Sequence, residues 1–221
     1  MTESVWLRRN RPRREAPPLT RERIVAEAVA LLDEEGAGRL TMRRLAERLD
    51  TGATTLYWHV KTKDDVLELA LDAVFGDVPV PGAGTDWRAD VIALMSGWRA
   101  AMLRHPWSAS ILGGRPLLGP EVMARTDFLY AALAATGLTG TRLAGAAYAV
   151  ANYVIGSALM EVGARRDDGP EAEKAAEGHL ARHRDRYPHL AAHGHLSGGE
   201  WDDAFRQGLG YLLDGVARAG T

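Results

Sequence analysis

The segment 40–63 reads LTMRRLAERLDTGATTLYWHVKTK, and it determines the architecture that we expect for the N-terminal part of the chain. Leu45 and Leu49 recur at the spacing of one helix face. The turn-forming residues 50–52 follow, and Leu56 is the inward position of a short second helix. Two short helices that join through a three-residue turn and turn their leucines to a common core are what a helix-turn-helix requires.

The polar side chains of this segment remain on its outside. Hydroxyl, aromatic and cationic groups in this arrangement can be divided between the phosphates and the base edges of a DNA duplex. An alternative stays open, in which the aromatic run 57–59 is a partly buried cluster and the arginines form a solvated face. The candidate DNA-binding residues are Thr41, Arg43, Arg44, Thr54, Thr55, Tyr57, Trp58, His59, Lys61 and Lys63.

Helix-period patterning dominates the whole chain, and we find no run of alternating strand residues. Thr20, Thr41 and Thr62 stand where helix N-caps are preferred, and Gly36 stands where a helix ends. The sequence therefore predicts an all-α protein. After the N-terminal helices, the predicted helices are 86–104, 106–112, 119–136, 140–164, 171–186 and 199–218.

A stretch rich in proline and glycine, 76–85, is the best candidate for a domain boundary. It divides the chain into a helix-turn-helix domain at 19–76 and a larger helical domain at 86–221. Residues 1–18 precede them and hold arginines and prolines, so we expect a flexible basic arm. Such an arm either enters a DNA minor groove or is a tail without a role in binding.

The charges of the chain are unevenly sorted along it. The 221 residues carry a formal net charge of -2, yet 5–23 contains seven arginines against two glutamates. Between 37 and 63, six basic residues stand against two acidic ones, and the acids of 27–35 and 64–72 belong to other segments. Local basic patches of this kind can hold phosphates even when the whole chain is slightly acidic.

Composition excludes several classes of protein. The absence of cysteine rules out disulfides, thiolate zinc sites and cysteine nucleophiles. The first residues lack the apolar region of a signal peptide. The apolar stretch 143–160 is built mainly of alanine and glycine and contains Asn152 and Ser157, so a buried helix is expected there rather than a membrane span. We expect a cytoplasmic protein.

Two runs in the N-terminal domain, 40–49 and 56–63, resemble the DNA-binding domain of the tetracycline repressor family. The resemblance covers about 19–75, and it rests on Leu-Tyr-Trp-His-Val-Lys at a fixed distance from Thr-x-Arg-x-Leu-Ala. Ala53 and Thr54 depart from the Gln and Pro of the tetracycline repressor itself, so the operator of that protein is not expected here.

This resemblance implies roles for individual residues. Thr41 and Arg43 would touch DNA at the start of the first helix of the motif. Thr55 and the run 57–59 would contact backbone and bases, and Lys63 would bind a phosphate.

The larger domain resembles the same family more weakly. The run 111–116, Ile-Leu-Gly-Gly-Arg-Pro, is similar to the family's segment ending Leu-Gly-x-Arg-Pro. Where tetracycline-responsive members carry a metal-binding histidine, this chain has Ile111, which cannot ligate magnesium. The resemblance therefore implies a small apolar or aromatic effector, bound without a metal or another cofactor.

Candidate effector-binding residues are the large or polar side chains of the apolar helices in this domain. Each of them has an alternative interpretation as an ordinary core residue, because pockets and cores use the same residue types. The candidates are Trp98, Met102, Trp107, Ile111, Arg115, Phe128, Tyr148, Asn152 and Met160.

Near the C-terminus an apolar stripe runs from Trp201 through Phe205 and Leu209 to Val216. Together with the small-residue helix 140–164, it resembles the family's dimer interface, a four-helix bundle made by two subunits. A homodimer presents two reading helices, so its operator should be roughly palindromic. The function implied is that of a ligand-responsive transcriptional regulator, a repressor released from double-stranded operator DNA by its effector.

Five of the seven histidines lie between 179 and 195, and two pairs of them are spaced four residues apart. The rival hypothesis is therefore a helical metal-binding protein or metalloenzyme that uses this segment. We find no His-Glu-x-x-His, nucleophile elbow or P-loop, and we expect no enzymatic activity. A second rival is a helix-turn-helix protein that binds DNA architecturally, without a ligand.

Overall fold

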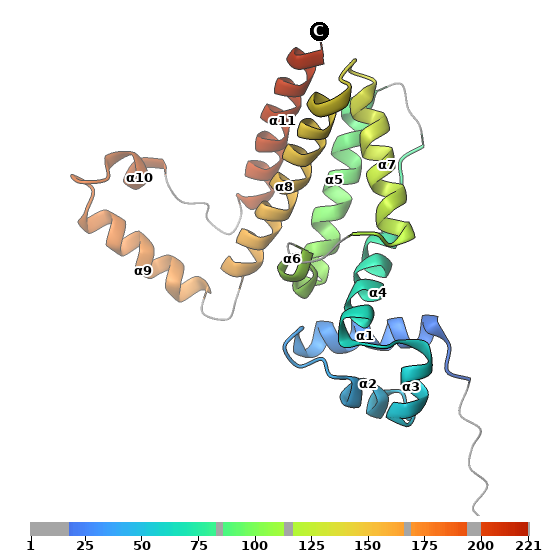
Figure 1. Ribbon diagram of the computed structural model, residues 1–221. Helices are drawn as coiled ribbons and strands as arrows, with labels where there is room; N and C mark the ends of the chain where they lie inside the picture. The colour runs from blue at the N-terminus through green and yellow to red at the C-terminus, as the bar shows by residue number, and fades with distance from the viewer. Residues whose placement is uncertain (1–17, 83–85, 113–116, 166–168, 194–199, 221) are drawn as a thin grey trace, which may run out of the picture. The chain divides into compact units, whose positions relative to one another are not determined.

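The computed structural model describes residues 18–82, 86–112, 117–165, 169–193 and 200–220. Within these ranges every regular element is a helix, which confirms the all-α prediction (Figure 1). The helices are α1 (Arg21–Glu35), α2 (Met42–Arg48), α3 (Ala53–His59), α4 (Lys63–Gly76), α5 (Trp87–Arg104), α6 (Pro106–Leu112), α7 (Pro120–Ala134), α8 (Gly140–Ala164), α9 (Gly169–Arg182), α10 (Pro188–His193) and α11 (Trp201–Gly220).

The chain forms two compact units, Met1–Leu67 and Glu68–Thr221. The division falls inside α4, so this helix contributes its first turn to the first unit and the rest to the second. The predicted basic arm 1–18 lies almost entirely outside the described residues. One predicted helix differs from the structure: instead of 171–186, α9 runs from Gly169 to Arg182. The separate short helix α10 starts at Pro188, because proline suits the first position of a helix.

Threonine side chains start three of the first four helices, as predicted. The Oγ1 atoms of Thr20 and Thr41 accept hydrogen bonds from the backbone N–H groups three residues on, at 3.2 and 3.1 Å. At α4, Asp65 N donates to Thr62 Oγ1 at 3.0 Å and Thr62 N donates to Asp65 Oδ2 at 3.3 Å. This reciprocal pair satisfies donors that the first helical turn would otherwise leave free.

In the first unit, α1 packs on α2 and α2 packs on α3. The core consists of aliphatic side chains that are at most 3% exposed, with Ile24 and Leu31 on α1 and Leu45 on α2 among them. Because this core is small, α2 and α3 each bury one face against it and expose their remaining faces to solvent.

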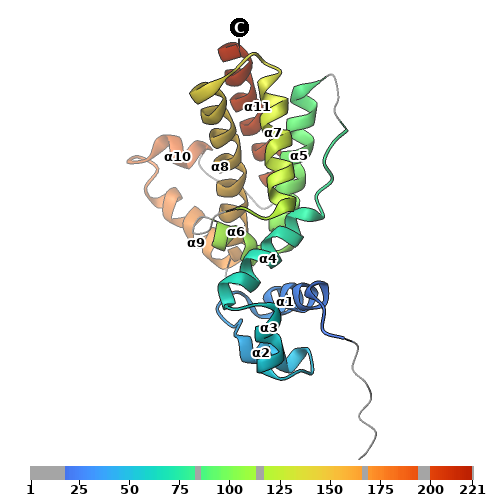
Figure 2. The same cartoon turned by 45° about the vertical axis from the view of Figure 1, so that its right-hand side comes forward.

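In the second unit, α5, α7, α8 and α11 lie side by side (Figures 1 and 2). The short α6 packs against α5 and α8. Fully buried side chains such as Met95, Val154 and Leu213 fill the space between the four long helices. Close approach of α8 and α11 depends on Gly208, because a Cβ there would overlap the Tyr153 hydroxyl.

A buried ion pair joins three helices of this second unit. Arg99 of α5 donates to the carboxylate of Glu161 on α8, which is fully buried, and to Asp202 Oδ1 of α11 at 2.7 Å. Arg165 donates to the other oxygen of Glu161 at 2.5 Å. The guanidinium carbon of Arg99 lies 4.8 Å from the ring centroid of Phe205. A buried carboxylate requires such partners, since an unpaired charge in the interior is costly.

Candidate DNA-binding surface and effector site

One buried side chain holds the short helix α3 on the first unit. Leu56 is fully buried, and Leu45 of α2 and the α2 C-cap residue Leu49 are at most 1% exposed. All other side chains of α3 are exposed. The helix therefore presents nearly its whole polar and aromatic surface outward.

The turn between α2 and α3 is a helix C-cap made without glycine. Asp50 adopts φ 49°, Asp50 N donates to Glu47 O at 3.2 Å, and Thr51 N donates to Ala46 O at 3.0 Å. These two bonds are those of a Schellman motif, whose left-handed position glycine normally fills and aspartate tolerates. The motif ends α2 abruptly, so that α3 can start within three residues.

The aromatic residues of α3 are surface groups. Trp58 is 79% exposed, Tyr57 is 43% exposed, and His59 is exposed as well. Lys61 Nζ lies 6.0 Å from the centroid of the Trp58 ring and donates to Tyr57 O at 2.9 Å. The alternative of a partly buried aromatic cluster is therefore not what the structure shows.

The side chains of two further candidate DNA-binding residues form hydrogen bonds with backbone groups. Lys63 Nζ donates to Ala37 O at 2.8 Å and is half-buried. Thr41 uses its Oγ1 as the acceptor that caps α2. Both groups retain hydrogen-bonding capacity, because an ammonium has three donors and a hydroxyl can donate while it accepts.

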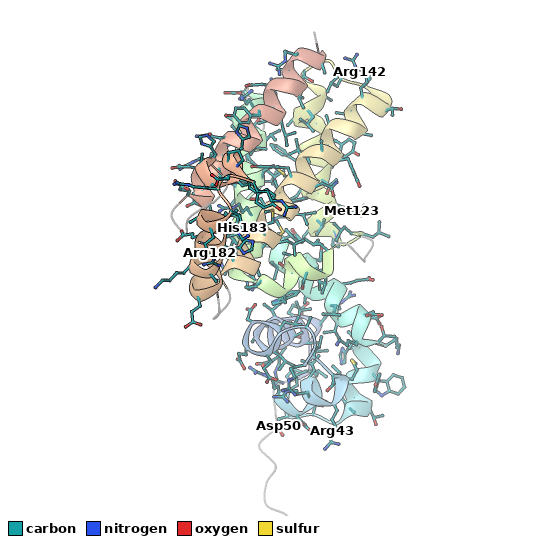
Figure 3. The ribbon with its side chains drawn as sticks, turned by 90° about the vertical axis from the view of Figure 1, so that its left-hand side faces the viewer. Arg43, Asp50, Met123, Arg142, Arg182 and His183 are labelled. Atoms are coloured by element: carbon teal, nitrogen blue, oxygen red, sulfur yellow. The ribbon has the colours of Figure 1, made fainter. Side chains whose placement is uncertain are left out.

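Each arginine of α2 faces a glutamate. The side chain of Arg43 is 89% exposed, points away from the helices (Figure 3), and places Nε 2.9 Å from Glu47 Oε1. Arg44 Nη2 lies 2.5 Å from Glu35 Oε1 of α1. Among these arginines, Arg43 is the one whose partner comes from its own helix and whose side chain projects most freely into solvent.

The charge sorting expected from the sequence needs a correction here. Arg48 donates to Glu34 and, at 3.3 Å, to Glu27 Oε2. The hydrogen bond from Arg48 holds the pKa of Glu34 below its ordinary value. The acids of α1 were expected on a separate segment, but packing of α1 on α2 brings them onto the arginines. Glu27 and Glu34 are seven residues apart, so both lie on one face of α1. This spacing was the sign in the sequence that the two glutamates could share a partner.

The candidate effector-binding residues separate into two groups in the second unit. Trp98, Met102 and Trp107 are at most 5% exposed and belong to the interior. Ile111 and Phe128 are half-buried. These five come from α5, α6 and α7, which the structure packs around α8 or against one another.

The other group lies on the outer surface of α8. Tyr148 is 73% exposed, Met160 is 65% exposed, and Asn152 is exposed with its Nδ2 donating to Tyr148 O at 2.8 Å. The face of α8 that turns inward carries Ala147, Val150, Val154, Ala158 and Glu161 instead. These three candidates therefore lie on a different face of α8 from the buried one, and their part in effector binding remains a prediction.

Three buried side-chain atoms of α5 and α6 have no hydrogen-bond partner among the described residues. They are Trp98 Nε1, Arg99 Nε and Ser108 Oγ. Ser108 of α6 is fully buried, and sequence reasoning did not single it out. A buried donor without a partner is costly unless a ligand or water supplies an acceptor.

Two cavities lined by described residues lie elsewhere in the second unit. One of about 430 Å³ lies between α9 and α10 and is lined by Glu177, Arg184 and His193 among others. Another of about 310 Å³ lies between α8 and α11, with Arg142 and Leu212 in its lining. Neither lining includes any of the predicted effector-binding residues.

Known families account for both units. The model of the tetracyclin repressor-like C-terminal domain matches residues 78–219, and the model of bacterial regulatory proteins of the tetR family matches 24–70. The chain belongs to the tetR family. It is a helix-turn-helix transcriptional regulator that binds operator DNA as a dimer and takes small-molecule ligands.

Individual tetR-family proteins align over nearly the whole chain. An HTH-type transcriptional regulator of Saccharopolyspora erythraea is 47% identical over 97% of this chain and 91% of that protein. The HTH-type transcriptional repressor DrrR1 of Streptomyces coeruleorubidus is 34% identical over 97% of this chain and 83% of its own length. The structure of Streptomyces coelicolor ActR in complex with actinorhodin is 30% identical, with a TM-score of 0.82 over 92% of this chain and 99% of that chain.

The position that departs from tetracycline-responsive members of the tetR family is near the end of α6. Ile111 is half-buried there, and the helix ends at Leu112. The following residues 113–116, which include the candidate Arg115, lie outside the described part of the chain.

The histidine-rich segment gains no support as a metal site. The rings of His179 and His183 on and after α9 stack with centroids 4.3 Å apart, and His183 Nδ1 lies 2.9 Å from His179 O (Figure 3 labels His183). Across the described ranges, no three His, Asp or Glu side chains come together as a metal site would need. Residues 194–199, with His195, lie outside those ranges.

The helix α8 is long and apolar enough, by length and composition alone, to cross a membrane. In the structure it packs against α5, α7 and α11, with Val150 and Val154 fully buried. It is a central helix of the tetR-family C-terminal domain, and its outer face carries the exposed Tyr148 and Met160.

Proposed function

We propose that this chain is a cytoplasmic repressor, without catalytic activity, that binds a roughly palindromic operator as a homodimer. A small apolar or aromatic effector, held without metal in the domain 86–221, would release it. The domain 19–76 would read the DNA. The observation that carries the proposal is the outward presentation of α3, with Trp58 79% exposed beside Tyr57 and Lys61.

The DNA contacts are assigned by chemistry. Arg43 and Lys61 supply cations for phosphates or guanine, and the hydroxyls of Thr54 and Thr55 suit either phosphates or base edges. The planar groups of Tyr57 and its neighbours on α3 can lie against sugars and the methyl groups of thymine. Arg44 is expected to contribute less than Arg43, because its side chain is 48% exposed against 89% for Arg43.

Support for the homodimer comes from the exposed side of the second unit. Tyr148, Leu159 and Met160 on α8 and Tyr211 on α11 are 40–73% exposed, although they are large and apolar or aromatic. The helices α8 and α11 pack on each other, so their outer faces adjoin. Apolar patches of this kind on a soluble protein favour association, and a second copy with twofold symmetry buries both patches at once.

Support for a metal-free effector comes from α6 and α5. Ile111 cannot ligate a cation, and Trp98 and Met102 offer an apolar and aromatic interior. ActR, a family member, has been solved with actinorhodin and with (S)-DNPA. Actinorhodin is accordingly the first compound to test, by its effect on the melting temperature of this protein and on its affinity for DNA.

The decisive experiment uses a duplex that the wild-type protein selects from a random pool. Tyr57→Ala should weaken binding by about tenfold to a hundredfold, the loss of a specific base contact, while the protein stays folded and dimeric by sedimentation. Tyr130→Ala is the matched control, since Tyr130 is an exposed tyrosine of α7 in the second unit. Full affinity of Tyr57→Ala in a gel-shift assay would contradict the proposal.

A further inference from the structure

The C-terminal half of α4 is attached to the first turn of α7 by a carboxylate. Asp72 Oδ1 accepts hydrogen bonds from the backbone N–H groups of Glu121 and Val122, both at 3.0 Å. The N-cap position of α7 is Gly119, which has no side chain to offer. Asp72 therefore caps α7 from another helix and places its negative charge at the positive end of the α7 dipole.

A buried cation completes the attachment from the other side. Arg125 of α7 donates from Nε to Val78 O at 2.7 Å and from Nη2 to Gly76 O, the last residue of α4. Its remaining nitrogen donates to Glu121 Oε2 at 2.7 Å. Arg125 is only 6% exposed. A guanidinium at the C-terminus of α4 satisfies carbonyls that have no partner within the helix and opposes their partial negative charge.

Side chains of each helix fill the space beside a glycine at this contact, next to Gly119 and Gly76. A Cβ added to Gly119 would overlap the Asp72 carboxylate, and one added to Gly76 would lie 3.1 Å from Glu121 Cγ. We call Asp72 and Arg125, with the backbone groups that they bind, the α4–α7 clasp. The clasp consists of directional hydrogen bonds, from the N-terminus of α7 to Asp72 and from Arg125 to the C-terminus of α4. Because hydrogen bonds depend on direction, they resist sliding and rotation of α4 against α7 more than apolar packing does.

We propose that Asp72 and Arg125 are positioning residues for operator binding. The helix α4 is continuous from Lys63 to Gly76, and its first turn belongs to the DNA-reading unit. The helix α4 is therefore the covalent link between the two units, and the clasp holds the end of it that lies in the second unit. Fixing that end would restrict the separations that the two reading helices of a dimer can adopt. The inference rests on the proposed function as a dimeric DNA-binding regulator.

The test measures the distance between the two reading units of a dimer. The chain has no cysteine, so Arg39→Cys, an exposed position of the first unit, takes a single spin label per subunit. Arg125→Met keeps a side chain of similar length but removes its hydrogen bonds, and Asp72→Ala removes the cap. Pulsed electron resonance should show a label-to-label distribution at least about twofold wider for either variant than for the labelled parent. The affinity for the selected duplex should fall by about tenfold, within the range of ordinary coupling.

Two controls separate positioning from a merely structural role. Leu129→Ala removes a buried α7 side chain that is 2% exposed, so it destabilises the unit but leaves the distribution as narrow as that of the parent. Asp72→Asn keeps an acceptor oxygen and should restore a narrow distribution. If Arg125→Met does not fold by circular dichroism, the comparison of Asp72→Ala with Asp72→Asn decides the matter.

Equal widths for Asp72→Ala, Asp72→Asn and the parent would overturn the inference, as would a distribution that Leu129→Ala widens to the same extent. Failure of the proposed function is a different result, because it shows in the labelled parent itself. A parent that is monomeric or selects no duplex contradicts the dimeric regulator, and the inference falls with it.

Discussion

The two units of the chain use charged side chains in opposite ways. In the DNA-reading unit, the pairs of Arg43, Arg44 and Arg48 lie at the surface, and every one of these arginines is at least 30% exposed. In the second unit, Glu161 is fully buried and shared between Arg99 and Arg165. Surface pairs exchange readily with water or a phosphate, whereas a buried pair must be satisfied permanently.

This difference suits the two tasks of a ligand-controlled regulator. The reading unit needs cations that can leave their glutamates when a polyanion arrives. The second unit needs helices held in register, and Arg99 links α5 to α8 and to Asp202 at the start of α11. Four measurements test this difference between the two units.

The largest effect is expected at the buried pair. Glu161→Ala leaves the Arg99 guanidinium in the interior with Asp202 as its remaining acid partner, and should lower the free energy of unfolding by about 3–5 kcal/mol. Urea denaturation at fixed protein concentration, followed by circular dichroism, measures it. Glu161→Gln is the control of similar shape, which keeps an acceptor and should lose less. If Glu161→Ala lowers the free energy of unfolding by less than about 1 kcal/mol, the buried pair contributes no more than a surface pair, and the two units do not differ in this respect.

A smaller effect is expected at the start of α4 in the reading unit. Thr62→Ala removes the hydroxyl that accepts from Asp65 N at 3.0 Å, and should cost about 1 kcal/mol of stability, as other N-cap replacements do. Thr62→Ser retains the hydroxyl and should be close to wild type in the same denaturation experiment. If both substitutions cost the same, the methyl group rather than the cap is responsible.

The surface pairs of α2 should contribute less still, and in a salt-dependent way. Glu34→Gln removes the main partner of Arg48, so a slight loss of thermal stability is expected at low ionic strength. Near 1 M salt the loss should vanish, since the screening length falls to about 3 Å. A loss that persists in high salt would show that this pair acts like a buried one.

The smallest effect is expected for Asp202, the exposed partner of Arg99, and it concerns how the stability of the protein depends on pH. The hydrogen bond and the charge of Arg99 hold the pKa of Asp202 below its ordinary value. A lowered folded-state pKa means that the stabilisation is complete above the unfolded pKa, about 4, and disappears as the pH falls further. Asp202→Asn should therefore flatten the loss of stability below about pH 4, and an unchanged acid-side slope would contradict the assignment.

Local chemistry was enough to predict most helix boundaries. Thr20, Thr41 and Thr62 cap their helices as expected, because a hydroxyl three residues before a free N–H is a short-range arrangement. The outward position of Tyr57 and Trp58 was predicted too, since Leu56 alone among its neighbours on α3 suits a core. The DNA contacts assigned to them remain a prediction.

Side-chain partners from different helices could not be predicted in the same way. The pairing of Arg48 with Glu27 and Glu34 depends on how α1 packs against α2. Tyr148 and Met160 carry residue types that suit either a pocket or an interface, and the period of α8 does not say which face turns inward. The Asp72 cap of α7 joins residues about fifty positions apart, for which no short motif exists.

Capping, helical period and motif spacing are properties of neighbouring residues, so the helical class, the helix-turn-helix and the family could be predicted from the amino-acid order. Which charges are neutralised, which apolar faces stay exposed and how α4 is tied to α7 became visible only with the helices packed together. These depend on distances between segments far apart in the chain, where packing of whole helices selects one arrangement among many that the local pattern allows.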